Sequence, residues 1–462
     1  MLRRLLAFFC CWLLIAPAWA VNEKQVRALF WHGQIPLTQL GTVSNLILPA
    51  SGTAAQYTYV APGAGITALT TNTSFGTLIT SSGTISNLVA GSAGNADNGT
   101  VTITLMKNTV AQSLTCPLTI SNAGTLTQCL DTNPTHALNV VPGDILVWRL
   151  TTTQAAWNSL NNVTISWTFK STNGQNGTLW TGSGSSAAGT GATAAYFGPG
   201  TQGANATESA ITGIAPSDGY INGFRVVLNA ADSGANFHTF YLCHNSAAGA
   251  CTSSPLTCNT SVTPFTGCVA TGAPIHIAPT DTFSIEDVGT ASATAKFTQI
   301  AINWQASVPG QSPVFLYSTA APPNTTTYYP LTGAAGGNTT EGSAWSMTSQ
   351  FPTSLTISNM YFFIPVSHTA GKSRTLTLKA AATPFPTATT ATTPLHCLNS
   401  GTATAGGGNG FNAGGGNLTG ILCADLADQV NLPAAAFADW AISVVATDSG
   451  SAYHGSYIAV IR

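Results

Sequence analysis

The feature that most constrains the fold is one order of segments that recurs three times along the chain. Each copy has two alternating apolar segments, then a pair of cysteines, then two further alternating segments. The first segments read "GTISNLVA", "GYINGFRV" and "LTISNMYF", at residues 83–90, 219–226 and 355–362. Five features in the same order, three times, predict a tandem array of similar units rather than one large core.

The segments of each copy alternate with a period of two. In residues 100–105, Val101, Ile103 and Leu105 point to one side and three threonines to the other. This period, in β-branched and aromatic residues, is typical of strands with one buried face and one wet face. Gly, Asn, Asp and Pro separate the segments. We therefore predict an all-β chain of three tandem antiparallel β-sandwich domains, of jelly-roll or immunoglobulin-like type.

Composition predicts where the units begin and end. A Gly/Ser-rich stretch after the first copy is typical of a flexible linker, and a shorter stretch with two prolines after the second copy indicates a stiffer one. The N-terminal apolar segment could form an extra strand or one exchanged between molecules. The predicted division is 1–20, signal peptide; 21–50, N-terminal segment; 51–171, sandwich 1; 172–195, Gly/Ser-rich linker; 196–306, sandwich 2; 307–313, Pro-containing linker; 314–462, sandwich 3.

The start of the chain has the features of a removable secretory signal. Arg3 and Arg4 precede an apolar run from residue 5 to residue 15, and residues 18–20 read Ala-Trp-Ala, a small-x-small cleavage site. The apolar run is shorter than the roughly 20 residues that a membrane-spanning helix requires. We therefore expect a secreted or cell-surface protein whose mature chain has no membrane span.

Ten cysteines are present, and Cys10 and Cys11 lie in the predicted signal, so eight remain for the mature chain. An even number in an exported chain predicts disulfides. The recurring pairs are separated by 12, 9 and 25 residues, a variation that a disulfide loop tolerates better than a metal site does. The predicted pairs are Cys116–Cys129, Cys258–Cys268, Cys397–Cys423 and, from the two cysteines left over, Cys243–Cys251.

The second unit offers one alternative to its disulfides. There His238 and His244 accompany Cys243, Cys251, Cys258 and Cys268, which are residue types that bind zinc. The matching cysteines of the other two units have no such histidines. A catalytic thiolate is disfavoured because every cysteine has a partner, and we expect no metal and no cofactor.

Charge and motifs narrow the function classes. Thirteen basic and fifteen acidic side chains make up 6% of the chain, where soluble domains average about 25%. Such a surface does not attract phosphate backbones, so we expect no nucleic-acid partner, and its weak charge favours self-association. Neither an HExxH nor a GxSxG motif occurs, and we expect no enzymatic activity.

Some carboxylates are candidates for particular roles. Asp144, Asp281 and Asp439 fall at matching repeat positions, where an aspartate can accept hydrogen bonds from the main chain of a turn that opens a strand. Asp425 and Asp428 could bind a calcium ion, although two carboxylates three residues apart usually form a solvated turn.

Aromatic residues offer a candidate binding surface. Tyr196, Phe197, Tyr328 and Tyr329 lie early in the second and third units, either as exposed rings that stack on sugars or as strand residues with one ring in the core. The sequence thus favours a secreted, non-enzymatic structural or adhesive protein of the cell surface or extracellular matrix. It could be a filament subunit joined through residues 21–40. The alternative is a carbohydrate-binding array, with or without weak glycoside-hydrolase activity; candidate partners are other copies of the chain or surface glycans.

Overall fold

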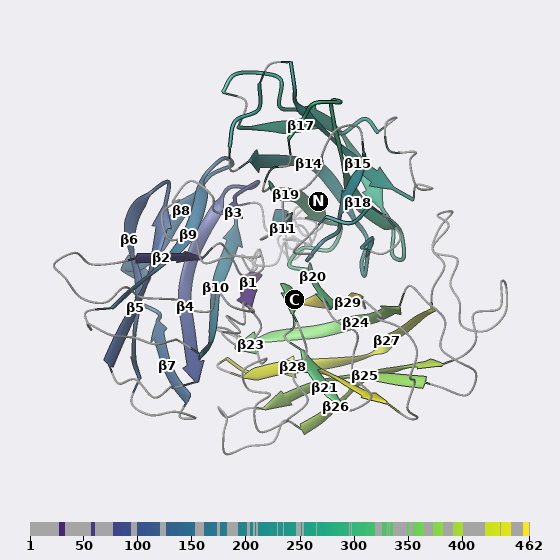
Figure 1. Ribbon diagram of the computed structural model, residues 1–462. Coiled ribbons are helices and arrows are strands. Elements are labelled where there is room, and N and C mark those ends of the chain that lie inside the picture. Colours follow the sequence, from purple (N-terminus) through teal and green to yellow (C-terminus); the bar gives the residue numbers. More distant parts are fainter. Residues whose placement is uncertain are drawn as a thin grey trace, which may run out of the picture.

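The computed structural model describes most of the three copies (Figure 1). The described residues are 27–32, 57–60, 77–93, 99–120, 126–152, 161–172, 176–182, 193–200, 204–206, 208, 211–228, 230–233, 235–245, 251, 254–264, 266–294, 296, 298–318, 326–329, 331, 333–335, 349–350, 354–364, 373–381, 391–400, 421–434, 436–444 and 456–461. Within them the chain is nearly all β, which confirms the predicted class, with one 3-10 turn at Pro134–His136. No helix in this part of the chain has the length and apolar character to cross a membrane.

Unit 1 consists of two facing sheets. Its first sheet has the order β1-β10-β4-β7, with β8 on β4, and its second sheet has the order β2-β9-β5-β6, with β3 on β9. The strands are β1 (Arg27–His32), β2 (Tyr57–Val60), β3 (Thr77–Leu78), β4 (Gly83–Ala93), β5 (Gly99–Lys107), β6 (Val110–Ile120), β7 (Leu126–Asp131), β8 (Leu138–Val140), β9 (Ile145–Thr152) and β10 (Asn161–Ser171).

Unit 2 repeats this plan. Its first sheet has the order β11-β19-β14-β17, and its second sheet has the order β12-β18-β15-β16, with β13 on β18. The strands are β11 (Asn176–Gly182), β12 (Ala195–Phe197), β13 (Gly213–Ile214), β14 (Gly219–Leu228), β15 (His238–His244), β16 (Thr257–Asn259), β17 (Gly267–Ile277), β18 (Thr282–Gly289) and β19 (Thr298–Ala306).

Unit 3 repeats it again. Its first sheet has the order β22-β20-β29-β24-β27, and its second sheet has the order β21-β28-β25-β26, with β23 on β28. The strands are β20 (Ser312–Ser318), β21 (Thr327–Tyr329), β22 (Gly333–Ala335), β23 (Ser349–Gln350), β24 (Leu355–Ile364), β25 (Ser373–Ala381), β26 (Ala391–Ser400), β27 (Ile421–Leu432), β28 (Phe437–Val444) and β29 (Ser456–Ile461).

The strand order decides between the two predicted architectures. In every unit the first strand pairs with the last one, the second strand pairs with the next-to-last one, and the chain passes from one sheet to the other. This is the order of a jelly roll rather than of an immunoglobulin fold. Strand pairs are antiparallel except for the short parallel pair of β20 and β22.

The predicted period of two matches the burial. Val101, Ile103 and Leu105 of β5 are at most 1% exposed, and they pack with Trp148 and Trp167 between the sheets of unit 1. The two indole rings lie 5.3 Å apart. Trp304 and Trp440 are buried in the same way in units 2 and 3.

One backbone irregularity explains part of the repeated sequence. Asn87, Gly223 and Asn359 have φ angles of 53°, 152° and 51° and lie where the strand register shifts. Such bulges require a left-handed residue, which Gly and Asn adopt at the lowest cost. The common pattern of "ISN", "ING" and "ISN" at these places therefore encodes the same bulge in β4, β14 and β24.

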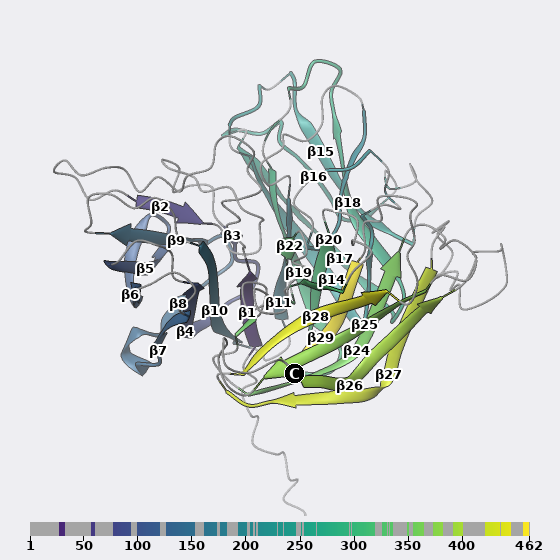
Figure 2. The same ribbon diagram turned by 60° about the horizontal axis from the view of Figure 1, so that its bottom comes forward.

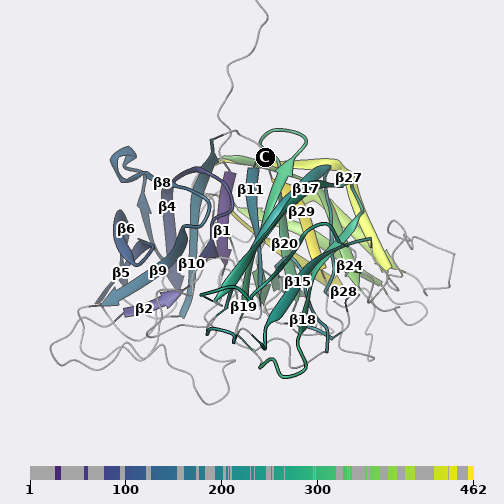
Figure 3. The same cartoon turned by 90° about the horizontal axis from the view of Figure 1, so that it is seen from above.

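The three units surround a common centre, near which β1, β11 and β20 lie (Figures 1, 2 and 3). The contacts between units run in a cycle. β3 of unit 1 contacts β19 of unit 2, and β23 of unit 3 contacts β10 of unit 1. Unit 2 meets unit 3 through a shared apolar cluster in which Phe283 packs against Phe315, with ring centroids 5.9 Å apart. Each unit thus places its second sheet against the first sheet of the next.

The predicted linkers contain the first strands of units 2 and 3. β11 lies within residues 172–195, pairs with β19 and buries Leu179 at 6% exposure, so this part of the Gly/Ser-rich stretch is not a flexible linker. β20 begins at residue 312, inside the Pro-containing segment. In the N-terminal segment, β1 pairs with β10 of the same chain. The predicted signal peptide, 1–20, lies outside the described residues.

Candidate functional site

All four predicted disulfides are present, with Cα–Cα distances from 4.8 to 5.8 Å. Each of the three recurring bridges joins an edge strand of the second sheet to an edge strand of the first sheet. The strands joined are β6 and β7, β16 and β17, and β26 and β27. The task of these bridges is therefore constant although the loop between the cysteines varies in length. Because the sulfurs are bonded to each other, they offer no thiolates for the zinc alternative.

A carboxylate stands beside two of these bridges. Asp131 and Asp425 follow the second cysteine by two residues, and each accepts a hydrogen bond of 3.0 Å from the main chain beside the first cysteine, at Thr115 and His396. Each also accepts bonds from the main chain that follows it, at Asn133 in unit 1 and at residues 427 and 428 in unit 3. These carboxylates hold the disulfide-linked strands together.

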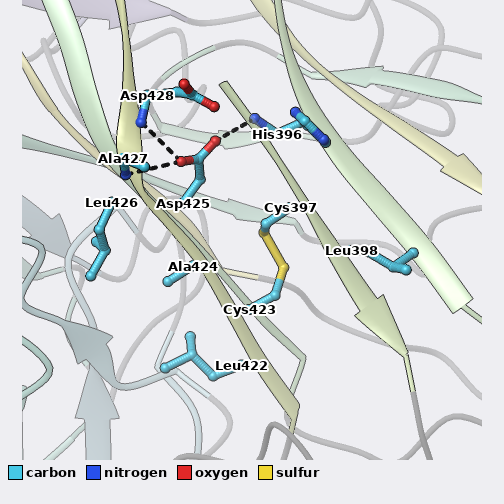
Figure 4. A pocket seen from close by; sticks show the side chains of 10 residues that line it. All are labelled: His396, Cys397, Leu398, Leu422, Cys423, Ala424, Asp425, Leu426, Ala427 and Asp428. Atoms are coloured by element: carbon cyan, nitrogen blue, oxygen red, sulfur yellow. Dashed lines mark hydrogen bonds between the residues drawn. A yellow bond between two sulfur atoms is a disulfide. The ribbon is translucent and has the colours of Figure 1, made fainter. Parts of the chain in front are cut away.

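A hollow of about 710 Å³ lies beside the third bridge (Figure 4). Ligand-type atoms of His396, Asp425 and Asp428 lie within 4.8 Å of one another there. His396 Nδ1 donates to the Pro394 carbonyl at 2.6 Å, because a carbonyl can only accept. Calcium takes six to eight oxygen ligands. An imidazole and two carboxylates, of which Asp425 is already engaged with the main chain, do not fit that ion.

Asp144 and Asp281 hold the predicted turns. Each accepts from the main-chain N–H three residues earlier, at Val141 (2.9 Å) and Ala278 (2.8 Å). An asparagine side chain also donates to each carboxylate, from residues 108 and 245. Burial acts to raise the pKa of both carboxyls. These hydrogen bonds, together with Lys107 beside Asp144 and His244 beside Asp281, outweigh it and hold the pKa below its ordinary value.

The prediction for Asp439 is wrong. The turn of unit 3 contains Ala436, whose N–H donates to the Pro433 carbonyl, at the place of the two aspartates. Strand register confirms this match, since residue 437 pairs with β23 just as residue 145 pairs with β3. Asp439 lies inside β28 and is fully buried. The repeat pattern aligns Asp439 with Asp144 and Asp281 because all three are aspartates, whereas the turn forms with an alanine at that place.

Unit 2 has a buried charged group that the sequence did not indicate. His238, 1% exposed, directs Nδ1 to Asp287 at 2.9 Å and Nε2 to the Thr294 carbonyl at 3.1 Å. Both ring nitrogens lie within hydrogen-bond distance of oxygen atoms, an arrangement that favours the protonated ring. Burial acts to lower the pKa of His238, but the Asp287 carboxylate outweighs it and raises that pKa. Asp232 lies 3.9 Å from Nε2. His238 and Asp287 lie on the paired strands β15 and β18, which are far apart in the sequence.

The four candidate sugar-stacking aromatics lie in the interior. Tyr196, Phe197, Tyr328 and Tyr329 are 4%, 0%, 5% and 0% exposed, which favours the core interpretation over the stacking one. Tyr196 donates its hydroxyl to Glu286 Oε1 at 3.1 Å. Glu286 is 3% exposed, its second oxygen accepts no hydrogen bond, and burial raises its pKa.

One aromatic ring does lie at the surface. Among the Phe, Tyr and Trp side chains that the structure describes, Tyr220 is the exposed one, at 38%. It is the second residue of β14 in unit 2 and lies opposite His276 of β17.

Comparison with known proteins adds no assignment. No protein-family model matches the chain, and a search of curated proteins finds no match.

Proposed function

We propose that the protein is a secreted, non-enzymatic structural or adhesive protein of the cell surface or extracellular matrix. The observation that carries the proposal is that the disulfides and the carboxylates beside them serve to hold strands together. One recurring disulfide in each unit joins its two sheets at the same edge. Asp131 and Asp425 accept hydrogen bonds from the main chain beside two of these bridges. These groups fasten the two sheets of a unit to each other, which suits a protein that presents a surface outside the cell.

Export is supported by two independent features. The first twenty residues resemble a cleavable signal, and the eight other cysteines are paired in four disulfides. Disulfides persist in oxidising compartments and are rare where glutathione keeps thiols reduced.

A discrete particle is favoured over a strand-exchanged filament. β1 pairs with β10 in the position that β11 and β20 take in the other units, so the first sheet of unit 1 finds its first strand in its own chain. The cyclic contacts between units are likewise formed within one chain. We propose that the mature chain is a compact adhesive or structural head.

The test is to locate the protein and to remove it. Immunogold labelling of producing cells should mark the cell surface or the surrounding matrix, and deletion of the gene should reduce attachment of those cells to a surface or weaken their matrix. Peptide mapping without reduction should recover the four disulfides. Retention of the protein in the cytoplasm with free thiols, or turnover of any compound in a broad hydrolase screen, would overturn the proposal.

A further inference from the structure

A row of three side chains crosses the first sheet of unit 2. Gln305 of β19 and His276 of β17 lie opposite Tyr220 of β14 in the antiparallel register. Residues directly opposite one another share a face of a sheet. The next residue of β14, Ile221, and the one before Gln305, Trp304, are both fully buried. The row therefore lies on the outward face of this sheet.

The row is held in place, and its Tyr220 and His276 members are exposed to solvent while Gln305 is half-buried. The Tyr220 and His276 rings lie 5.1 Å apart at an interplanar angle of 52°. His276 Nε2 contacts Asp218 Oδ1 at 2.7 Å, and the two side chains are 52% and 43% exposed. On the other side of the tyrosine, Asn222 Nδ2 donates to Gln305 Oε1 at 2.9 Å. The polar groups that flank Tyr220 are thus oriented by their own neighbours.

The other two units show what the fold requires at this position. In unit 1, Thr84 lies opposite Asn139, and its hydroxyl donates to the amide oxygen at 3.0 Å. In unit 3, Thr356 lies opposite Asn431 with the same bond at 2.6 Å. A Thr–Asn pair is sufficient for the sandwich in both. The Tyr–His pair of unit 2 is therefore an addition that the fold does not need.

We propose that Tyr220, His276 and Gln305 form a platform that binds one ring of a neutral glycan. An exposed tyrosine offers an apolar face for stacking on a sugar ring. Neighbouring strands lie about 4.8 Å apart, so the flanking groups reach the hydroxyls at the edges of the stacked ring. Asp218 Oδ1 pairs with His276 and Oδ2 accepts from Ser307, and each carboxylate oxygen has a second lone pair that can accept from a sugar hydroxyl. Gln305, held by Asn222, borders the tyrosine on the other side. Since Asp218 and His276 pair with each other, the platform has no excess positive charge to select an acidic sugar.

This proposal rests on the adhesive function and gives it a ligand class. The probe is an array of neutral oligosaccharides, namely β-glucan, chitin, mannan and galactan fragments, incubated with the labelled mature protein. Retained sugars are then titrated by calorimetry. The test variant, Tyr220→Thr/His276→Asn, installs the pair that units 1 and 3 already carry. The matched control, Thr356→Ala, changes the equivalent position of unit 3.

We expect at least one neutral oligosaccharide to be retained, with affinity at least tenfold weaker in the double variant and unchanged in the control. Equal melting temperatures will show that the variant is folded. A wild-type protein that retains no neutral sugar, or a double variant that binds as tightly as wild type, overturns the platform. Cell attachment that persists in the double variant after its sugar binding is lost overturns the platform's role in adhesion, while surface location still supports the proposed function. Cytoplasmic retention overturns the proposed function whatever the array shows.

Discussion

Phe315 is the side chain whose removal tests whether units 2 and 3 are stabilised by one another. It lies on β20 of unit 3, is 7% exposed and belongs to the apolar cluster of unit 2. Its ring meets Phe283 of β18 edge to face, at an interplanar angle of 87°. The carbonyl of Phe315 also approaches Gly200, where an added Cβ would lie 2.8 Å away. Phe315→Ala therefore opens a cavity in the joint itself.

The expected loss follows from this burial. A phenylalanine buries about 150 Å² or more, which at about 25 cal/mol per Å² corresponds to about 4 kcal/mol. Large-to-small substitutions of buried phenylalanine cost about 3–5 kcal/mol, the same range. Phe315→Leu keeps most of the apolar volume and should cost about 1 kcal/mol. Val308→Ala, at a position that is 42% exposed in the neighbouring segment, should change stability by less than about 0.5 kcal/mol.

The assay is hydrogen exchange followed by mass spectrometry in increasing urea, because a chain of this size need not unfold in one step. In Phe315→Ala, β18 of unit 2 and β20 of unit 3 should lose protection together, while β5 of unit 1 keeps it. Loss confined to β20 would refute the coupling between the two units. A change below about 1 kcal/mol at both strands would refute the packing argument.

Three other predictions concern single groups. Burial raises the pKa of Glu286 above its ordinary 4.5, so the folded protein holds this proton more tightly and loses stability as pH rises from 4.5 to the raised pKa. Glu286→Gln should therefore melt higher than wild type at pH 7 and equally at pH 4, by scanning calorimetry. Removing the Cys397–Cys423 bridge with serines should cost about 3.5 kcal/mol for its sequence separation of 26, measured as the urea midpoint. Asp425→Ala leaves three main-chain N–H groups without their acceptor and should cost about 2–3 kcal/mol in the same assay, whereas Asp428→Ala should cost less than about 0.5 kcal/mol.

Local pattern was sufficient for the strands and the disulfides. The alternation of Val101, Ile103 and Leu105 with threonines predicts a strand with one buried face, and all three side chains are buried. Three disulfides follow from the repeat, because each recurring pair of cysteines lies on the same two strands of its unit. The fourth, Cys243–Cys251, follows from the two cysteines that remain. The repeated "ISN" and "ING" patterns, in turn, follow from a bulge that needs Asn or Gly in the left-handed region.

Other features depend on which residues meet through space. Glycine and serine content predicted a linker where β11 pairs with β19, because composition does not report the apolar contact that buries Leu179. Tyr196 and Tyr328 lie in polar segments, as surface aromatics often do. Their strands, however, pair with β18 and β28, which are far away in the sequence, and the two side chains are buried there.

The sequence by itself determined that this chain is all β, repeated three times and tied by disulfides, since these properties reside in spacings along the chain. Only the tertiary structure decided which faces are covered. Alternation separates the two faces of a strand but does not say which one meets another unit. The register of β19, β14 and β17 brings Gln305, Tyr220 and His276 into one row, although these residues are far apart in sequence.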